Sequence, residues 1–452
     1  MTVFGLIAVN IRRMRFRLAS AASAIALSAV VVTLAAPAVT FPLRVSANRQ
    51  HLEDNTGAPF LVVGDTAWSL VAQLNETDIE RYLDDRAVRG FNAIIVNLLE
   101  HKFASHAPAT VGGVQPFAAG RMFEVPNAEY FDIAHRAVAA AGRRGISVWL
   151  CPAYLGWDGG DEGFFKEINA AGHDALRNYG RFVGERFKDL PNIVWMLGGD
   201  FAFPTSHRWL GDVLAAGLRD GGARQLMTAH GGQTAAVETF GDGDWIAVDT
   251  VYSYLKDLRE PLHAARVRRP QRPFVLIEST YEGEHDAPPE QIRFQAWAAM
   301  LSGATGQFFG NNPIWHFDGP TLFKYEGSWQ QALDSVGSRD MARLGAFFRS
   351  QPWIELQPAA DGQVVTTDTG VAPVAASSTD GTITIVYVPA HSTGTRELLL
   401  KSRHANAAQW FDPAGDASPV IANIDGDAES RLRVHTPGRN SAGATDWVLV
   451  LR

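Results

Sequence analysis

The sequence contains a single cysteine, Cys151, among its 452 residues. One thiol cannot form an intrachain disulfide framework, and it cannot supply a zinc site that needs several cysteines. The H-E-x-x-H motif of zinc hydrolases and the G-x-S-x-G motif of serine hydrolases are also missing. No G-x-G-x-x-G motif follows the first predicted strand, and no G-x-x-x-x-G-K motif occurs. We therefore expect no metal and no cofactor.

Basic residues are fewer than acidic ones, 40 Lys and Arg against 48 Asp and Glu, which gives a net charge of −8 at pH 7. This balance disfavours nucleic acid as a partner, because its phosphates repel an acidic surface. Hydrophobic residues make up 46% of the chain, enough to support a packed core. A length of 452 residues exceeds the roughly 250 to 300 that one core usually serves, so we expect two folded units. Nothing in the sequence indicates an oligomeric state.

The first 38 residues have the pattern of a targeting segment. Arginines at positions 12, 13, 15 and 17 precede an uncharged stretch over residues 18–36, and Ala36-Pro37-Ala38 resembles a cleavage site. This order predicts a signal peptide over residues 1–38 and a secreted or periplasmic protein. An uncleaved membrane anchor is the alternative, because the stretch approaches the length of a spanning helix. No later stretch is apolar enough to cross a bilayer, so we expect no stable membrane span in the mature chain.

Short apolar runs alternate with amphipathic helical patterns through the middle of the chain. Nearly continuous hydrophobicity is typical of parallel strands that are covered on both faces. Eight such runs occur, at residues 60–63, 93–96, 146–150, 193–197, 226–229, 246–248, 274–277 and 306–309. Eight strand–helix repeats predict a (β/α)8 TIM barrel, which we place at residues 39–352. An open doubly wound sheet is the alternative, but such sheets usually bind nucleotides through a motif that this chain lacks.

The pattern changes after Trp353. The runs at residues 382–388, 397–400 and 446–451 are rich in β-forming residues and are separated by Gly, Pro, Asp and Ser clusters. This short spacing without a helical stripe predicts a small antiparallel β-sandwich over residues 353–452. No low-complexity linker precedes it, so we expect it to pack directly against the barrel.

Two acidic residues follow predicted barrel strands directly. Asp200 comes after the fourth strand and Glu278 after the seventh. Catalytic groups of such barrels lie at the carboxyl ends of the strands, and three β/α units would place these two acids on opposite sides of the mouth. Paired carboxyl groups hydrolyse acetals, with retention at about 5 to 5.5 Å and with inversion at about 6.5 to 9.5 Å. Asp200 and Glu278 are the predicted catalytic pair. The structural alternatives are that Asp200 caps the next helix and that Glu278 pairs with an arginine.

Other polar and aromatic residues follow the remaining predicted strands. An aspartate after the first strand could bind sugar hydroxyls, and a tryptophan could stack on the apolar face of a sugar ring. The predicted substrate-binding residues are Asp65, Trp68, Asn97, His230, Tyr252, Asn311 and Trp315. The alternative for the first two is that Asp65 begins a helix and Trp68 belongs to the core. We assign Glu282 and Glu284 to a loop or to the rim of the cleft.

Three segments together resemble the apiosidase-like proteins of glycoside hydrolase family 140: residues 64–68, 195–200 and 277–279. The resemblance covers about residues 40–452, and the C-terminal part is similar to a domain labelled as collagen-binding. It implies a clan-A-like barrel with Asp200 as acid/base and Glu278 as nucleophile. It also implies a secreted or periplasmic enzyme that releases apiose from pectic side chains. Most members of the clan have Asn-Glu where this chain has Gly199-Asp200, and the shorter acid leaves the carboxyl separation open.

The sequence thus favours a secreted glycoside hydrolase that cleaves a plant-type, pectic polysaccharide or oligosaccharide with retention. Two other hypotheses belong to different classes. The barrel mouth could bind carbohydrate without catalysis, or the same barrel could carry a lyase. The sugar, the linkage and the choice between exo and endo action depend on the shapes of the loops.

Overall fold

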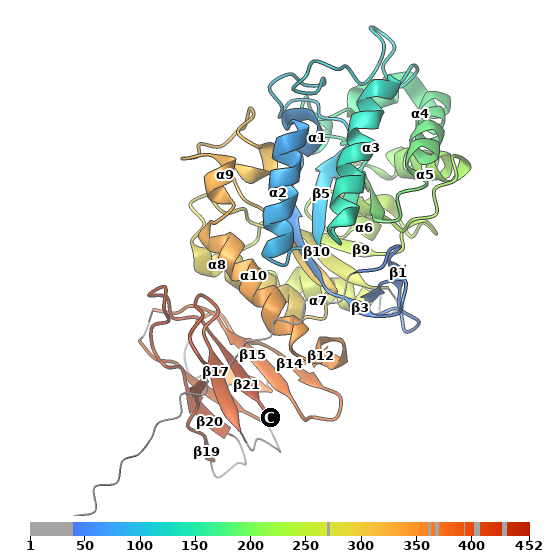
Figure 1. The fold of residues 1–452 in the computed structure, drawn as a ribbon. Helices are drawn as coiled ribbons and strands as arrows, with labels where there is room; N and C mark the ends of the chain where they lie inside the picture. The colour runs from blue at the N-terminus through green and yellow to red at the C-terminus, as the bar shows by residue number, and fades with distance from the viewer. Residues whose placement is uncertain are drawn as a thin grey trace, which may run out of the picture. The chain divides into compact units, whose positions relative to one another are not determined.

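Eight parallel strands form a nearly closed barrel in the computed structural model of the chain (Figure 1). The structure describes residues 39–268, 272–359, 363–366, 370–392, 394–401, 407–426 and 432–452. The predicted signal peptide at residues 1–38 lies outside the described residues, and residues 39–452 form one compact unit. Within the described part, no helix combines the length and the apolar character that a membrane span requires.

The barrel strands are short and buried along their whole length, which explains their nearly continuous hydrophobicity. They are β4 (Val62–Thr66), β5 (Ala93–Asn97), β6 (Ser147–Cys151), β7 (Ile193–Gly198), β8 (Met227–His230), β9 (Asp249–Tyr252), β10 (Phe274–Glu278) and β11 (Gly306–Phe309). Backbone pairing runs in the order β8-β7-β6-β5-β4-β11-β10-β9. The predicted (β/α)8 barrel is therefore confirmed.

Two threonines bridge the remaining gap between β8 and β9. Thr228 Oγ1 donates to the carbonyl of Val248 at 2.7 Å, and Thr250 Oγ1 donates to the carbonyl of Ala229 at 2.7 Å. A backbone hydrogen bond from the nitrogen of Ala247 to the carbonyl of Met227, at 2.9 Å, joins the same two segments. A small antiparallel sheet of β1 (Arg44–Val45), β2 (Leu52–Glu53) and β3 (Pro59–Phe60) precedes the barrel.

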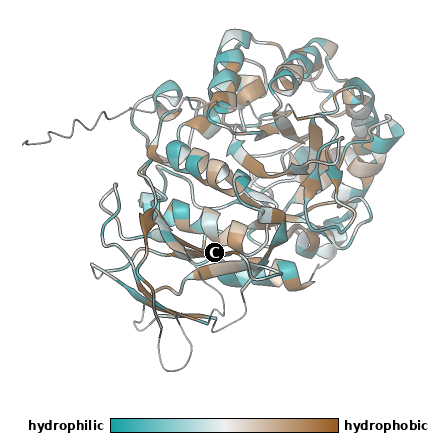
Figure 2. Ribbon diagram, turned by 60° about the horizontal axis from the view of Figure 1, so that its bottom comes forward, coloured by the Kyte–Doolittle hydropathy of each residue, from teal (hydrophilic) through white to brown (hydrophobic). Residues whose placement is uncertain are grey.

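Helices cover the outside of the barrel and bury its strands on the second face. Figure 2 shows hydrophobic residues concentrated on the strands and hydrophilic residues on the outer helices. The helices are α1 (Leu70–Gln73), α2 (Glu76–Val88), α3 (Ala128–Arg143), α4 (Phe165–Phe187), α5 (Trp209–Asp220), α6 (Ala236–Phe240), α7 (Arg259–Arg268), α8 (Pro289–Leu301), α9 (Trp329–Ala332) and α10 (Val336–Arg349). Single 3-10 turns lie at η1 (Trp157–Gly159), η2 (Thr205–His207), η3 (Ile314–His316) and η4 (Trp353–Glu355).

The C-terminal part forms two antiparallel sheets, in agreement with the predicted sandwich. The first has the order β12-β14-β15-β21-β17-β18 and the second the order β13-β16-β20-β19. Their strands are β12 (Leu356–Pro358), β13 (Val364–Thr366), β14 (Val374–Ser378), β15 (Thr384–Val388), β16 (Glu397–Leu400), β17 (Ala408–Phe411), β18 (Val420–Ile421), β19 (Asp425–Gly426), β20 (Leu432–His435) and β21 (Trp447–Leu451). Val386, Leu398 and Val434 belong to one buried cluster that both sheets share.

Helix α8 connects the barrel to the sandwich through both apolar and ionic contacts. Trp297 stacks on Tyr387 of β15, with ring centroids 5.7 Å apart. Arg293 is buried and donates two hydrogen bonds to Asp446, at 2.7 and 2.8 Å, and a third to Asp340 of α10 at 2.9 Å. The two parts therefore share one buried interface. The boundary between residues 352 and 353 stays a prediction.

Candidate active site

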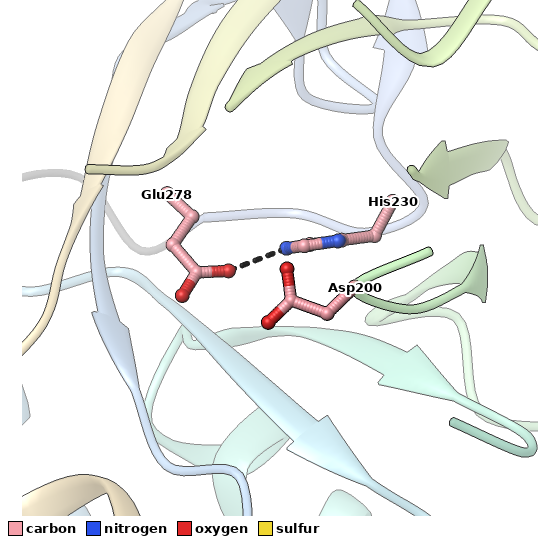
Figure 3. Close-up of side chains that lie close together, drawn as sticks. All are labelled: Asp200, His230 and Glu278. Atoms are coloured by element: carbon pink, nitrogen blue, oxygen red, sulfur yellow. Dashed lines mark hydrogen bonds and ion pairs between the residues drawn. The ribbon is translucent and has the colours of Figure 1, made fainter. Parts of the chain in front are cut away.

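Asp200, His230 and Glu278 meet at the carboxyl end of the barrel (Figure 3). His230 and Glu278 are the last residues of β8 and β10, and Asp200 follows β7 by two residues. One side-chain atom from each of the three residues lies within 4.8 Å of the other two. The two acids that were predicted from the strand ends thus face a common point.

A pair of glycines turns the chain from β7 toward this point. Gly198 and Gly199 have φ angles of 104° and 152°, a region that favours glycine. A Cβ atom on Gly198 would lie 2.3 Å from the carbonyl oxygen of His230, and one on Gly199 would lie 2.7 Å from the backbone nitrogen of Leu155. Only glycine lets the backbone approach both neighbours this closely and still direct Asp200 into the cleft.

Two donors orient the carboxylate of Glu278. His230 Nε2 donates to Glu278 Oε2 at 2.6 Å, and the Tyr254 hydroxyl donates to Oε1 at 3.1 Å. The other ring nitrogen of His230 donates to the carbonyl of Gly231 at 3.0 Å, because a carbonyl oxygen can only accept. Donation from both ring nitrogens requires the imidazolium form of His230. Burial alone would lower the pKa of His230, but the hydrogen bond and the negative charge of Glu278 raise it above its ordinary value.

The environment of Asp200 favours its protonated form. Burial and the nearby charge of Glu278 raise the pKa of Asp200 to about 7, although His230, Tyr252 and Tyr154 act in the opposite direction. The Tyr154 hydroxyl donates to Asp200 Oδ2 at 3.2 Å. The Tyr252 hydroxyl lies close enough to affect this pKa, but its geometry is not that of a hydrogen bond. Asp200 can therefore hold a proton near neutral pH.

A cleft of about 550 Å³ of empty space lies over the acid pair. Part of this space is open solvent, so a ligand can reach the two acids from outside the protein. The cleft is lined by Trp68, Asn97, Phe103, Tyr154, Glu162, Asp200, Tyr254, Glu278, Tyr281, Glu284, Trp315, Leu322 and Phe323. Its walls combine aromatic rings with carboxyl and amide groups.

Hydrogen bonds fix the two tryptophans of this cleft. Trp68 Nε1 donates to the Tyr281 hydroxyl at 2.9 Å, and Trp315 Nε1 donates to Glu284 Oε1 at 2.8 Å. Trp315 also contacts the edge of Phe103, with centroids 5.0 Å apart. Both indoles line the cleft, and Asn97 lines it with them. These three are the predicted substrate-binding residues that the structure brings to the cleft wall.

Two further predicted residues lie behind the acids and not on the cleft wall. His230 is completely buried and reaches the site through Glu278. Tyr252 packs against the His230 ring, with centroids 5.1 Å apart, and is 1% exposed. Both residues are placed to support Asp200 and Glu278 from behind, and neither lines the cleft.

Asp65 lies in the barrel wall, which differs from its expected position at the mouth. It is completely buried, and its Oδ2 accepts hydrogen bonds from Tyr82 at 2.8 Å and Arg86 at 3.2 Å. Side chains alternate along a strand, and a Cβ on the preceding Gly64 would contact the ring of Phe308 inside the barrel. Asp65 consequently points outward to α2, where burial raises its pKa to about 6 against the lowering effect of Arg86.

Asn311 is also outside the cleft. Its Nδ2 donates to Glu282 Oε2 at 2.7 Å and to Ser335 Oγ at 3.1 Å. Glu282 Oε1 accepts in turn from the backbone nitrogen of Gly337 at 2.9 Å. This network anchors the start of α10 and leaves Asn311 no direct access to a substrate.

Several cleft residues were not predicted from the sequence. Tyr154 and Tyr254 follow β6 and β9 by three and two residues, so a wider search of the strand ends could have found them. Phe103 and Phe323 lie on longer loops, where no sequence pattern indicates which side chain turns inward. Glu284 lies in a loop, as predicted, and it is 3% exposed and lines the cleft.

The Asp200, His230 and Glu278 set has the spacing of a metal site, with one ligand atom from each residue within 4.8 Å of the others. A histidine must be neutral at one nitrogen to bind a metal. Both ring nitrogens of His230 already have hydrogen-bond partners, Gly231 and Glu278, and its pKa is raised. The arrangement therefore fits proton transfer better than metal binding.

Comparison with protein families agrees with this geometry, because the model of the apiosidase-like catalytic domain matches residues 46–355. The chain belongs to the apiosidase-like family of glycoside hydrolases. A sequence comparison with curated proteins finds no match. The predicted resemblance and the predicted enzyme class are both confirmed, and an apiosidase-like glycosidase implies a carbohydrate substrate.

Solved structures show the same fold as this glycosidase. A glycoside hydrolase family 5 protein from Bacteroides vulgatus has a TM-score of 0.76 at 22% identity, over 90% of this chain and 92% of that one. Another structure, described as a glycoside hydrolase, has a TM-score of 0.75 at 22% identity, over 91% and 96% of the two chains. Both comparisons extend over the barrel and the sandwich of this glycosidase.

Proposed function

We propose that this apiosidase-like glycosidase hydrolyses its substrate with retention of the anomeric configuration. The supporting observation is the close approach of the acids: the nearest oxygens of Asp200 and Glu278 lie within 4.8 Å of each other. Retaining glycosidases place their carboxyl groups about 5 to 5.5 Å apart, whereas inverting enzymes need about 6.5 to 9.5 Å for a water molecule.

In this mechanism the two acids have different roles because their surroundings differ. Asp200 holds a proton near neutral pH and gives it to the glycosidic oxygen as the bond to the anomeric carbon breaks. Glu278, held by His230 and Tyr254, attacks the same carbon and forms a covalent glycosyl-enzyme. A water molecule then attacks this intermediate, Asp200 accepts its proton, and Glu278 is released.

The proposed substrate is a plant-type, pectic polysaccharide or oligosaccharide. Membership in the apiosidase-like family supports this choice. The aromatic cleft over the acid pair supports the binding of a sugar ring. The arginine-rich start, the apolar stretch and the Ala36-Pro37-Ala38 site support secretion or export to the periplasm.

The stereochemistry is tested by NMR of the first sugar released from a pectin fraction, before mutarotation scrambles the anomers. Retention gives a product with the configuration of the substrate, and the opposite anomer would exclude a glycosyl-enzyme. Product formation at any bond also separates hydrolysis from simple carbohydrate binding. An unsaturated product that absorbs in the ultraviolet would instead indicate a lyase.

The roles of the two acids are tested with azide, a small nucleophile that needs no base. In Glu278→Ala, azide should attack the substrate directly and give a glycosyl azide of inverted configuration. In Asp200→Ala, azide should attack the glycosyl-enzyme and give the retained azide, on substrates with good leaving groups. The reverse pattern would exchange the two assignments.

A further inference from the structure

Glu284 is a third carboxyl group in the catalytic cleft, and the mechanism above does not use it. It lies six residues after Glu278 in the loop before α8, it is 3% exposed, and it lines the cleft. Its Oε1 accepts a hydrogen bond from Trp315 Nε1 at 2.8 Å. Among the described residues, no group forms a hydrogen bond with Oε2 and no cation pairs with the carboxyl group.

Burial of such a group is costly unless a partner compensates for the lost water. The protein supplies one donor, Trp315, and places the negative Glu278 nearby. Burial and the charge of Glu278 raise the pKa of Glu284 to about 8, against the lowering effect of Trp315. A protonated carboxyl group has one O–H donor and also acceptor capacity, so it can donate to a substrate oxygen while it keeps Trp315 in place.

We propose that Glu284 binds a hydroxyl group of the sugar that occupies the cleft over Glu278. This inference rests on the proposed function, since it assumes that the cleft holds the sugar to be cleaved. The ligand is an uncharged sugar, because the residues that line the described cleft include Glu162, Asp200, Glu278 and Glu284 but no lysine, arginine or histidine. The carboxylate of a uronate would find no cationic side chain on the cleft wall to pair with.

The first test compares two substitutions of Glu284 by size and polarity. Glu284→Met keeps most of the side-chain volume but removes both oxygens, whereas Glu284→Gln keeps an acceptor for Trp315 and a donor for the sugar. The substrate is the para-nitrophenyl glycoside of a neutral sugar that the unmodified enzyme hydrolyses fastest. We expect kcat/KM to fall by about 30- to 100-fold in the Met variant and by less than about fivefold in the Gln variant.

The second test identifies the hydroxyl group. Each variant is assayed on monodeoxy forms of that glycoside, which lack one hydroxyl group at a time. The proposal requires that the penalty of Glu284→Met disappears on one deoxy substrate and persists on the others. An equal penalty on all of them would mean that Glu284 only supports Trp315, and it would overturn the proposal.

The matched control is Glu326→Met, the same chemical change at an exposed glutamate outside the cleft lining. It should leave kcat/KM unchanged. Thermal unfolding identifies a variant that fails to fold, and Glu284→Ala then replaces Glu284→Met in both tests. If the unmodified enzyme hydrolyses no glycoside or pectin fraction, the proposed function fails and this inference fails with it. If Glu284→Met retains full activity, only this inference fails.

Discussion

The proton on Asp200 provides a quantitative test of the site, because a single hydroxyl group controls part of its pKa. The pKa of Asp200 is raised to about 7 by burial and by Glu278, so kcat/KM should fall as the pH rises through about 7. Tyr154 donates to Oδ2 at 3.2 Å and stabilises the ionised form. Tyr154→Phe should therefore raise the pKa of Asp200. The alkaline limb of the pH profile, where kcat/KM falls, should then move to higher pH. A hydrogen bond of about 1 kcal/mol, at about 1.36 kcal/mol for each pH unit, moves this limb by about 0.7 pH units.

The measurement is kcat/KM from about pH 5 to about pH 9. The position of the limb reports the proton equilibrium of the free enzyme, so a change in substrate affinity alone does not move it. Tyr130→Phe is the control, because Tyr130 is a buried tyrosine that donates to the backbone of Leu98 and makes no contact with Asp200. A limb that stays in place in Tyr154→Phe, or that moves to lower pH, would refute the assignment of Asp200 as the acid.

Two further substitutions test the support of the site and of the fold. His230→Phe keeps an aromatic ring but removes the donor to Glu278, so kcat should fall by about 10- to 100-fold, and KM should change little because His230 does not line the cleft. A rise in KM as large as the fall in kcat would contradict this role. Arg293→Met should lower the free energy of unfolding by about 3 to 5 kcal/mol, because it leaves Asp446 and Asp340 buried without their partner. Chemical denaturation measures this change, and unaltered stability would show that the barrel and the sandwich do not depend on the contact.

The meeting of Asp200 and Glu278 could be predicted because their positions depend on strand order alone. Parallel strands of a barrel end at the same side, so an acid after the fourth strand and one after the seventh must share the mouth. Asp200 and Glu278 satisfy this rule in the structure. Trp68 and Trp315 line the cleft for the same reason.

Asp65 shows where this reasoning fails. The first strand was predicted at residues 60–63, whereas β4 spans Val62–Thr66, and Phe60 belongs to β3. Side chains alternate between the two faces of a strand, so the neighbours of a residue depend on its place in the register. Composition does not specify this register. The contact of Gly64 with Phe308 is a tertiary one, and it directs Asp65 outward.

The length and spacing of apolar runs determined that this chain forms a barrel followed by a sandwich, because burial on two faces or on one leaves a local pattern in the sequence. The separation of the carboxyl groups, the proton on Asp200 and the inward position of Glu284 were decided only by the tertiary structure. These quantities depend on distances and on the exclusion of water, and both arise from segments that meet only when the barrel closes.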